Sequence, residues 1–176
     1  MEAPRVLVLV RHAQAKDRAP EGGGDAQREL TKAGRRVARA VGEGLAGQGV
    51  RPDLAVVSPS ARTVATCEEL QAGGLRIADV WADAALYDAD VEDVLDSIRE
   101  VPDDVRTLVV IGHAPGVPAV AGWVENHTGR DDERLRADIE RWATAGLGVI
   151  VHEGPWASFP AEGSALVLLQ EPPAAD

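Results

Sequence analysis

Five short apolar runs, each containing β-branched residues, constrain the fold of this chain more than any other feature of its sequence. They are RVLVLV at 5–10, LAVVS at 54–58, TLVVIG at 107–112, GLGVIVH at 146–152 and SALVLLQ at 164–170. The first three are almost continuously apolar, which is typical of strands buried on both faces of a parallel sheet. The last two lie close together in the chain, and the Gly-Pro pair that starts the link between them predicts an antiparallel pair at one edge.

Segments with helical periodicity separate these runs. Four sets of apolar residues recur at the spacing of one helix face: Val37, Val41 and Leu45; Val91, Val94, Leu95 and Ile98; Val117, Val120, Ala121 and Val124; and Leu135, Ile139 and Trp142. Thr31 and Asp90 can cap the first two helices, and Pro115 and Pro118 lie near the start of the third, where a missing N–H costs little. Strands alternating with helices predict an α/β fold, a three-layer α/β/α sandwich with a mostly parallel central sheet and an antiparallel edge.

The length predicts a single domain over residues 1–176, because a chain of this size can bury one core and is short for two. The glycine-rich segment PEGGGDAQ at 20–27 is linker-like but marks no domain boundary. A single cysteine, Cys67, excludes an intramolecular disulfide framework, and no charged leader followed by an apolar stretch opens the chain. The apolar runs fall well short of the roughly 20 residues needed to span a bilayer. We therefore expect a soluble cytoplasmic protein with no membrane partner.

The formal net charge of -11 argues against a nucleic-acid partner, because proteins hold phosphate backbones with basic faces. If the substrate is an anion, the positive field that attracts it has to be local.

Three of the predicted strands end in polar side chains. The first ends in Arg11 and His12, the second runs into SPSAR with Ser58 and Arg62, and the third runs into GHAP with His113. In open α/β sheets the ligand binds beyond the carboxyl ends of the strands. These side chains are therefore expected to meet at one site.

Two guanidinium forks at one site indicate a dianion such as phosphate. A divalent metal is a poorer fit, because the guanidiniums would repel it and no carboxylate lies at these strand ends. A neutral imidazole can instead attack phosphorus through one ring nitrogen while the other donates a hydrogen bond that fixes the tautomer. A second histidine, if protonated, would donate to the equatorial oxygens of the phosphoryl group. This reasoning predicts phosphoryl transfer but leaves open which histidine attacks.

Four motifs, in order along the chain, resemble the signatures of the histidine phosphatase (phosphoglycerate mutase-like) superfamily. They are RHAQA at 11–15, LTKAGRR at 30–36, SPSARTVATC at 58–67 and GHAPGV at 112–117. More narrowly, the chain is similar to the short SixA-type branch of phosphohistidine phosphatases. The resemblance implies that His12 becomes phosphorylated, that Arg11 and Arg62 clasp the phosphate, and that His113 contacts the same group. It also implies that the enzyme needs no metal and no organic cofactor.

Ser58 is a further candidate for substrate binding at this site, although Ser58 and Pro59 also suit a turn. Ala13 stands where the wider family usually has glycine, which suits the SixA-type branch. Larger relatives carry a glutamate as general acid in an inserted segment, and here that region is only WADAALYDADVEDV at 81–94. Asp88 is the nearest possible proton donor, followed by Asp90, which is more simply a helix cap.

An acid-poor site favours phosphohistidine as the substrate, because imidazole can be protonated near neutral pH without a dedicated donor, whereas an alcohol leaving group needs one. A carboxylate on the loop at 15–29, such as Asp17 or Asp25, could also close over the pocket and supply the proton.

The sequence thus predicts a metal-independent phosphatase that acts through a phosphohistidine enzyme intermediate on a phosphate-bearing substrate, in first place a histidine-phosphorylated protein. The alternatives are a phosphatase for small phosphomonoesters (a sugar phosphate or nucleotide) and a non-catalytic phosphate-binding scaffold. The four tryptophans are expected to bury apolar surface, and Trp123 has the further option of leaning toward the pocket.

Overall fold

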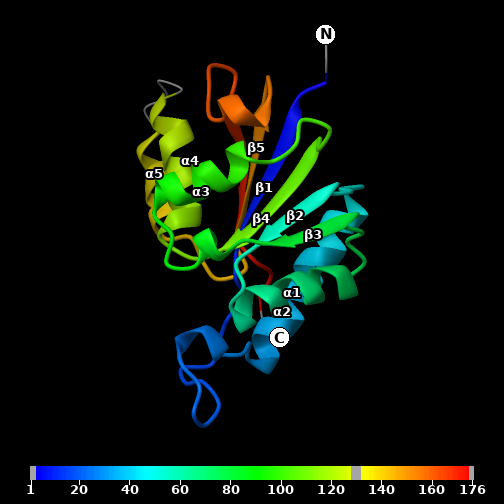
Figure 1. The fold of residues 1–176 in the computed structure, drawn as a ribbon, viewed down its shortest axis with the longest axis vertical. Helices are drawn as coiled ribbons and strands as arrows, with labels where there is room; N and C mark the ends of the chain where they lie inside the picture. The colour runs from blue at the N-terminus through cyan, green and yellow to red at the C-terminus, as the bar shows by residue number, and fades with distance from the viewer. Residues whose placement is uncertain (1–2, 128–131, 175–176) are drawn as a thin grey trace.

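The computed structural model describes residues 3–127 and 132–174. Within these residues six strands form one sheet, in the order β3-β2-β4-β1-β5-β6. In chain order the strands are β1 (Arg5–Arg11), β2 (Leu54–Val57), β3 (Asp79–Ala82), β4 (Thr107–Gly112), β5 (Leu147–His152) and β6 (Ala165–Gln170). Strands β1 to β4 are parallel to one another, whereas β5 is antiparallel to β1 and β6 is antiparallel to β5 (Figure 1).

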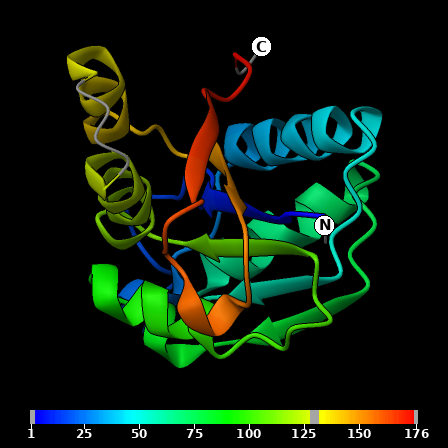
Figure 2. The same ribbon diagram turned by 90° about the horizontal axis from the view of Figure 1, so that it is seen from above.

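Helices cover both faces of this sheet (Figures 1 and 2). The α-helices are α1 (Lys32–Gly47), α2 (Ala61–Ala72), α3 (Val91–Arg99), α4 (Gly116–His127) and α5 (Glu133–Glu140), and short 3-10 helices lie at η1 (Asp25–Gln27), η2 (Ala84–Leu86) and η3 (Trp156–Ser158). Alternate residues of β1 separate the core into two halves: Val8 and Val10 pack with α1 and α2, and Leu7 and Leu9 pack with α3 and α4. The predicted three-layer α/β/α sandwich, mostly parallel with an antiparallel edge, is confirmed.

The structure confirms the five predicted strands and the two predicted helix caps. The side chain of Thr31 accepts a hydrogen bond from the Gly34 N–H, and the side chain of Asp90 accepts from the N–H groups of Glu92 and Asp93. Because each cap satisfies N–H groups that the first helical turn leaves without partners, it fixes where the helix begins.

Three expectations about local structure are wrong. Strand β3 is absent from the predicted set, because its four residues are all exposed and its apolar stretch, from Val80 to Ala82, is too short to indicate a strand. Trp81 on this strand, expected to be buried, is 43% exposed, and its indole N–H donates to Asp79. Helix α5 ends at Glu140, so Trp142 is buried in the loop after the helix rather than on its face.

Gly34 in α1 fixes the chain segment that follows β1. A Cβ atom at this position would lie 2.2 Å from the carbonyl oxygen of Gln14. This carbonyl accepts the Thr31 N–H at 2.9 Å, so the start of α1 and the segment after His12 are held against each other. The absence of a side chain at Gly34 is what permits this approach.

None of the helices in the described part of the chain is long and apolar enough to cross a membrane.

Candidate active site

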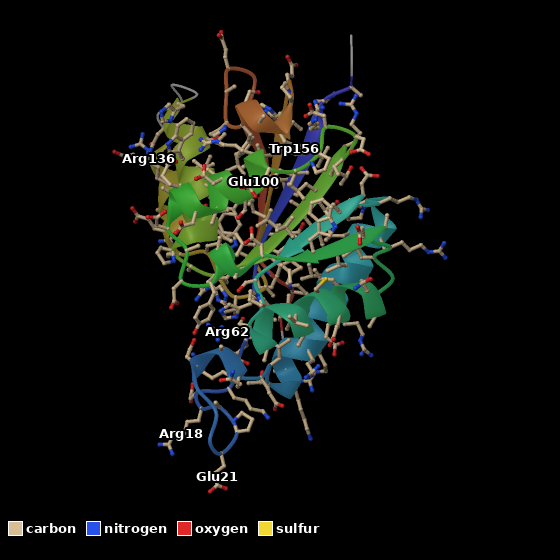
Figure 3. The ribbon with its side chains drawn as sticks, viewed as in Figure 1. Arg18, Glu21, Arg62, Glu100, Arg136 and Trp156 are labelled. Atoms are coloured by element: carbon tan, nitrogen blue, oxygen red, sulfur yellow. The ribbon has the colours of Figure 1, made fainter. Side chains whose placement is uncertain are left out.

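The polar side chains at the ends of β1 and β4 and at the start of α2 surround one cavity of about 490 Å³. The lining includes Arg11, His12, Arg62 and His113, so the structure brings together the four residues singled out in the sequence. The rings of His12 and His113 lie with their centroids 5.2 Å apart. Arg62 lies between the ends of the strands and the loop whose tip carries Arg18 and Glu21 (Figure 3).

The sheet register explains why these residues meet. In the parallel β1–β4 pair Arg11 is level with Gly112, so the next residues, His12 and His113, emerge side by side. The His12 N–H donates to the Gly112 carbonyl at 3.0 Å and continues the ladder by one bond. Strand β2 lies on the other side of β4, which brings the turn that precedes Arg62 to the same edge.

His12 has a defined tautomer. Its Nδ1 lies 2.8 Å from the carbonyl oxygen of Ala13, and because a carbonyl can only accept, Nδ1 carries the proton. The other ring nitrogen, Nε2, therefore keeps its lone pair. Burial, followed by the guanidiniums of Arg62 and Arg11, lowers the pKa of His12 to about 4. At neutral pH the ring is uncharged and can act as a nucleophile.

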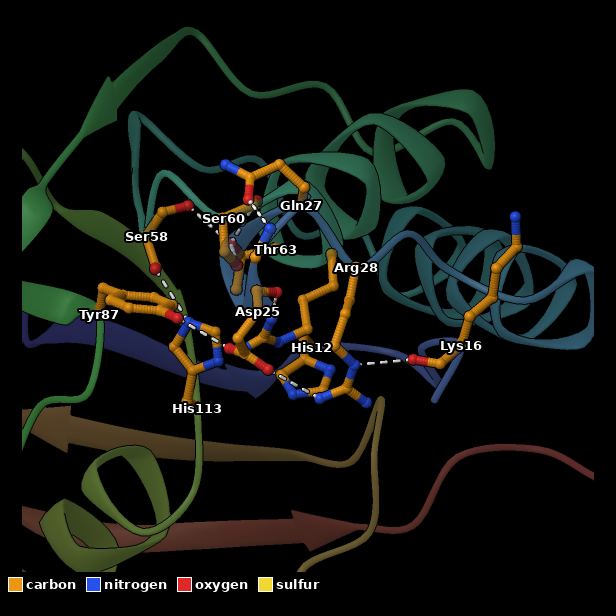
Figure 4. A network of polar contacts seen from close by, with 12 residues as sticks. His12, Lys16, Asp25, Gln27, Arg28, Ser58, Ser60, Thr63, Tyr87 and His113 are labelled. Atoms are coloured by element: carbon orange, nitrogen blue, oxygen red, sulfur yellow. Dashed lines mark hydrogen bonds and ion pairs between the residues drawn. The ribbon is translucent and has the colours of Figure 1, made fainter. Parts of the chain in front are cut away.

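His113 is supported from behind by Ser58. The Ser58 hydroxyl and His113 Nε2 share a hydrogen bond of 2.9 Å, and Ser58 is completely buried (Figure 4). Because Ser58 does not line the cavity, its predicted contact with the substrate needs correction: it reaches the site only through His113. Burial, followed by the charge of Arg62, lowers the pKa of His113 to about 4.

The two arginines are held by different partners. Arg11 Nη1 donates to the Trp142 carbonyl at 2.6 Å, so the loop after α5 orients this side chain. Arg62, only 6% exposed, donates from Nη1 and Nη2 to the backbone oxygen and the carboxylate of Asp25, at 2.9 and 3.0 Å. Both guanidiniums thus have fixed positions at the cavity before any ligand binds.

The candidate proton donors differ in their surroundings. Asp88 lines the cavity, is exposed and adopts a φ of 55°, a left-handed conformation that aspartate tolerates better than most residues. Asp90 also lines the cavity, but its carboxylate is occupied in capping α3. On the loop at 15–29, Asp25 contacts Arg62, whereas Asp17 is exposed and lines a separate hollow formed by the loop itself.

Two further residues at the site were not predicted. Arg28 lines the cavity, donating from Nε to the Lys16 carbonyl at 2.8 Å and from Nη1 to Asp25 at 3.0 Å. The Tyr87 ring packs edge-on against His113 at 5.6 Å between centroids. The one sequence signal for Arg28 is its place just before the LTKAGRR motif, and Tyr87 carries no signal of its own.

Trp123 does not face this cavity. It stacks on His127 at 3.5 Å between ring centroids and lines a different cavity of about 700 Å³, formed with residues 160–164. The option that Trp123 leans toward the phosphate pocket is therefore wrong, even though the cavity that it lines is the larger of the two. Among residues 3–127 and 132–174, no three His, Cys, Asp or Glu side chains come together in a way that could hold a metal ion.

Comparisons with known proteins agree on one family. The model of the histidine phosphatase superfamily (branch 1) matches residues 7–114. An uncharacterized protein of Mycobacterium tuberculosis is 32% identical over 160 residues, which cover 90% of this chain and 96% of that protein.

Solved structures extend the match to nearly the whole chain. A protein from Nakamurella multipartitia, provisionally assigned as a phosphohistidine phosphatase SixA, superposes with a TM-score of 0.84 at 31% identity, over 98% of this chain and 99% of that one. A protein from Agrobacterium tumefaciens with the same provisional assignment gives a TM-score of 0.77 at 25% identity, over 97% and 100%.

Proposed function

The chain belongs to the histidine phosphatase superfamily, in its short SixA-type branch, and on that premise we propose that it removes a phosphoryl group from phosphohistidine in a protein through a covalent intermediate on His12. The observation that carries this proposal is the His12 ring. Its Nδ1–H is bound to the Ala13 carbonyl, and the ring lines a cavity shared with two guanidiniums and a second imidazole. A module that only bound phosphate would not need an uncharged nucleophile at this position.

The first step transfers the phosphoryl group to the enzyme. Arg11 and Arg62 bind the phosphoryl oxygens, and Nε2 of His12 attacks phosphorus. The new P–N bond forms as the bond from phosphorus to the substrate's imidazole nitrogen breaks, and the departing imidazole takes up a proton. His113 faces the same group. Its ring is uncharged at neutral pH, so with Nε2 accepting from the Ser58 hydroxyl its Nδ1–H donates to the phosphoryl oxygens and stabilises their charge.

The second step regenerates the enzyme. Water attacks phosphorus, the P–Nε2 bond breaks, and inorganic phosphate leaves as His12 returns to its neutral form. Throughout both steps the hydrogen bond from Nδ1 to the Ala13 carbonyl keeps the attacking nitrogen aimed at the cavity.

Phosphohistidine suits this site because a dedicated acid is not required for its leaving group. We assign the role of proton donor for other leaving groups to Asp88, which lines the cavity and has the freedom of an exposed side chain. The rival substrate class, small phosphomonoesters, would depend on that donor. The acidic surface, with a net charge of -11, also disfavours small, highly charged anions in solution relative to a phosphoprotein that brings its own basic flank.

The test compares two substrates, phosphohistidine on a carrier protein and an aryl phosphate, with a metal chelator present. Wild type is expected to turn over both, with the higher kcat/KM on phosphohistidine. His12→Ala is expected to lose turnover of both. The matched control, His127→Ala, removes an exposed histidine that lies outside the site. Turnover that survives in His12→Ala contradicts the proposed nucleophile, and loss of turnover on chelation contradicts a metal-independent reaction.

A further inference from the structure

The loop between β1 and α1 carries a carboxylate that contacts two cations of the site. Asp25 Oδ2 accepts from Arg62 Nη2 at 3.0 Å, and Asp25 Oδ1 accepts from Arg28 Nη1 at 3.0 Å. The backbone oxygen of Asp25 accepts from Arg62 Nη1 at 2.9 Å, so one residue receives both terminal nitrogens of the Arg62 fork.

A third donor completes the environment of this carboxylate. The Tyr87 hydroxyl donates to Asp25 Oδ2 at 2.7 Å (Figure 4). The Arg62 guanidinium lies 5.9 Å from the centre of the Tyr87 ring. Hydrogen bonds from Tyr87, Arg28 and Arg62 hold the pKa of Asp25 well below its usual range. Asp25 is therefore ionised at neutral pH, so in this arrangement it acts as a hydrogen-bond acceptor rather than as a proton donor.

A carboxylate beside a phosphate-binding arginine could strengthen or weaken the binding of an anion. Inside the cavity it would compete with the phosphate dianion for the arginine. Asp25 is not among the residues that line the cavity, whereas Arg28 and Arg62 are; it lines a separate hollow formed by the loop itself. Its charge still acts on the site, since it raises the pKa of His113 against the larger effects of burial and Arg62. A guanidinium has five N–H donors, and Asp25 engages two of those on Arg62. Asp25 does not engage the remaining three, and Arg62 still lines the cavity.

These contacts preorganise the side chain of Arg28 in particular. Its side chain is 30% exposed, and a free arginine at the surface would lose considerable rotamer entropy on binding a ligand. The Lys16 carbonyl and Asp25 hold two of its nitrogens before a ligand binds. Most of the rotamer entropy of Arg28 is therefore already lost in the free protein and does not weaken binding. The loop thus delivers a preorganised third guanidinium to the cavity.

We propose that Asp25 is a positioning residue that holds Arg62 and Arg28 at the cavity, and that Arg28 is a further substrate-binding residue for the phosphoryl group. This inference rests on the proposed function, because it assumes that the cavity takes a phosphoryl group. It assigns to the loop at 15–29 a part in substrate binding that the strand ends alone do not provide.

Binding of inorganic phosphate to the full chain, measured by calorimetry, tests the proposal without turnover. Asp25→Asn and Arg28→Ala are each expected to weaken binding by about 10-fold, the effect of one lost charge-assisted contact. The matched control is Asp17→Asn, which removes the same charge from an exposed position on the same loop and is expected to change affinity by less than about twofold.

The sign of the Asp25→Asn effect is decisive. Removing a negative charge near the cavity would by itself tighten the binding of an anion, whereas loss of positioning weakens it. In the double variant Asp25→Asn with Arg28→Ala, the losses are expected to be less than additive, because Asp25 acts partly through Arg28. Unchanged or tighter binding in Asp25→Asn, or strictly additive losses, overturns the positioning role, and unchanged binding in Arg28→Ala overturns the contact.

Two further measurements keep the result interpretable. Arg28→Lys keeps the charge but not the fork and is expected to fall between wild type and Arg28→Ala; it remains informative if Asp25→Asn does not fold. Wild-type protein that binds phosphate as described but turns over no substrate contradicts the proposed function and leaves this inference intact. Wild-type protein that does not bind phosphate overturns both.

Discussion

His113 makes the stability of the phosphate-free protein depend on pH, and the size of this dependence follows from its surroundings. The ring is 9% exposed, and its pKa is lowered from 6.5 to about 4 by burial and then by Arg62. The unfolded chain therefore binds more protons than the folded protein between these two values. The contribution of His113 to the free energy of unfolding is therefore fully present above pH 6.5. It is lost as the pH falls toward 4 and does not change further below that.

Between pH 7 and pH 5 this one histidine is expected to cost about 2 kcal/mol of unfolding free energy. The assay is urea denaturation at both pH values for wild type and His113→Gln, whose amide nitrogen can keep the contact that His113 Nε2 makes with Ser58. The difference between the two pH values should be smaller in His113→Gln by about that amount. His127→Gln, which removes an exposed histidine, should behave as wild type. Equal pH dependence in wild type and His113→Gln would refute the reasoning.

Inorganic phosphate should reduce the loss of unfolding free energy at pH 5, because a bound anion favours the charged form of the His113 ring.

Three other predictions concern the arginine clasp, the loop and the proton donor. Arg62→Ala should lower kcat/KM by roughly 100-fold or more, through the loss of charge-assisted bonds to the phosphoryl group; a change below tenfold would contradict the clasp. Gly34→Ala should lower the free energy of unfolding by about 2 kcal/mol or more, because its Cβ would meet the Gln14 carbonyl at 2.2 Å, whereas Gly44→Ala, with no atom within 4 Å, should be neutral or stabilising in the same urea titration. Asp88→Asn should leave phosphohistidine hydrolysis nearly intact and slow aryl and alkyl phosphates; an equal effect on all substrates would demote Asp88 to a loop residue.

The fold and the central part of the site are predictable because both depend on local pattern. The buried strands β1, β2 and β4 are continuous apolar runs, and the chemistry-bearing residues follow directly at the strand ends. Parallel pairing then forces Arg11, His12 and His113 to one edge of the sheet. Strand β3 escapes detection because it is a short, exposed edge strand whose apolar stretch, from Val80 to Ala82, is too brief to indicate a strand. The indole N–H of Trp81 donates to Asp79 rather than to a partner in the core.

The parts that escape prediction depend on contacts between distant segments. Asp25 and Arg62 are 37 residues apart, and Asp25 and Tyr87 are 62 apart, so no local spacing indicates that they meet. The carboxylate of Asp25 could be suspected of closing over the pocket, but whether it supplies a proton or orients arginines depends on its three donors. The same holds for Ser58. The sequence predicts that it lies at the end of a strand, but it does not predict that the side chain is buried behind His113.

The most direct test of the central claim is to trap the enzyme intermediate. Wild-type protein would be mixed briefly with phosphohistidine on a carrier protein, quenched in alkali and analysed by peptide mass spectrometry. The proposal predicts one phosphoryl group on the peptide that contains His12, stable to alkali and labile to acid, and absent from His12→Ala. A phosphoryl group on His113 or on a hydroxyl residue, or full turnover by His12→Ala, would contradict it.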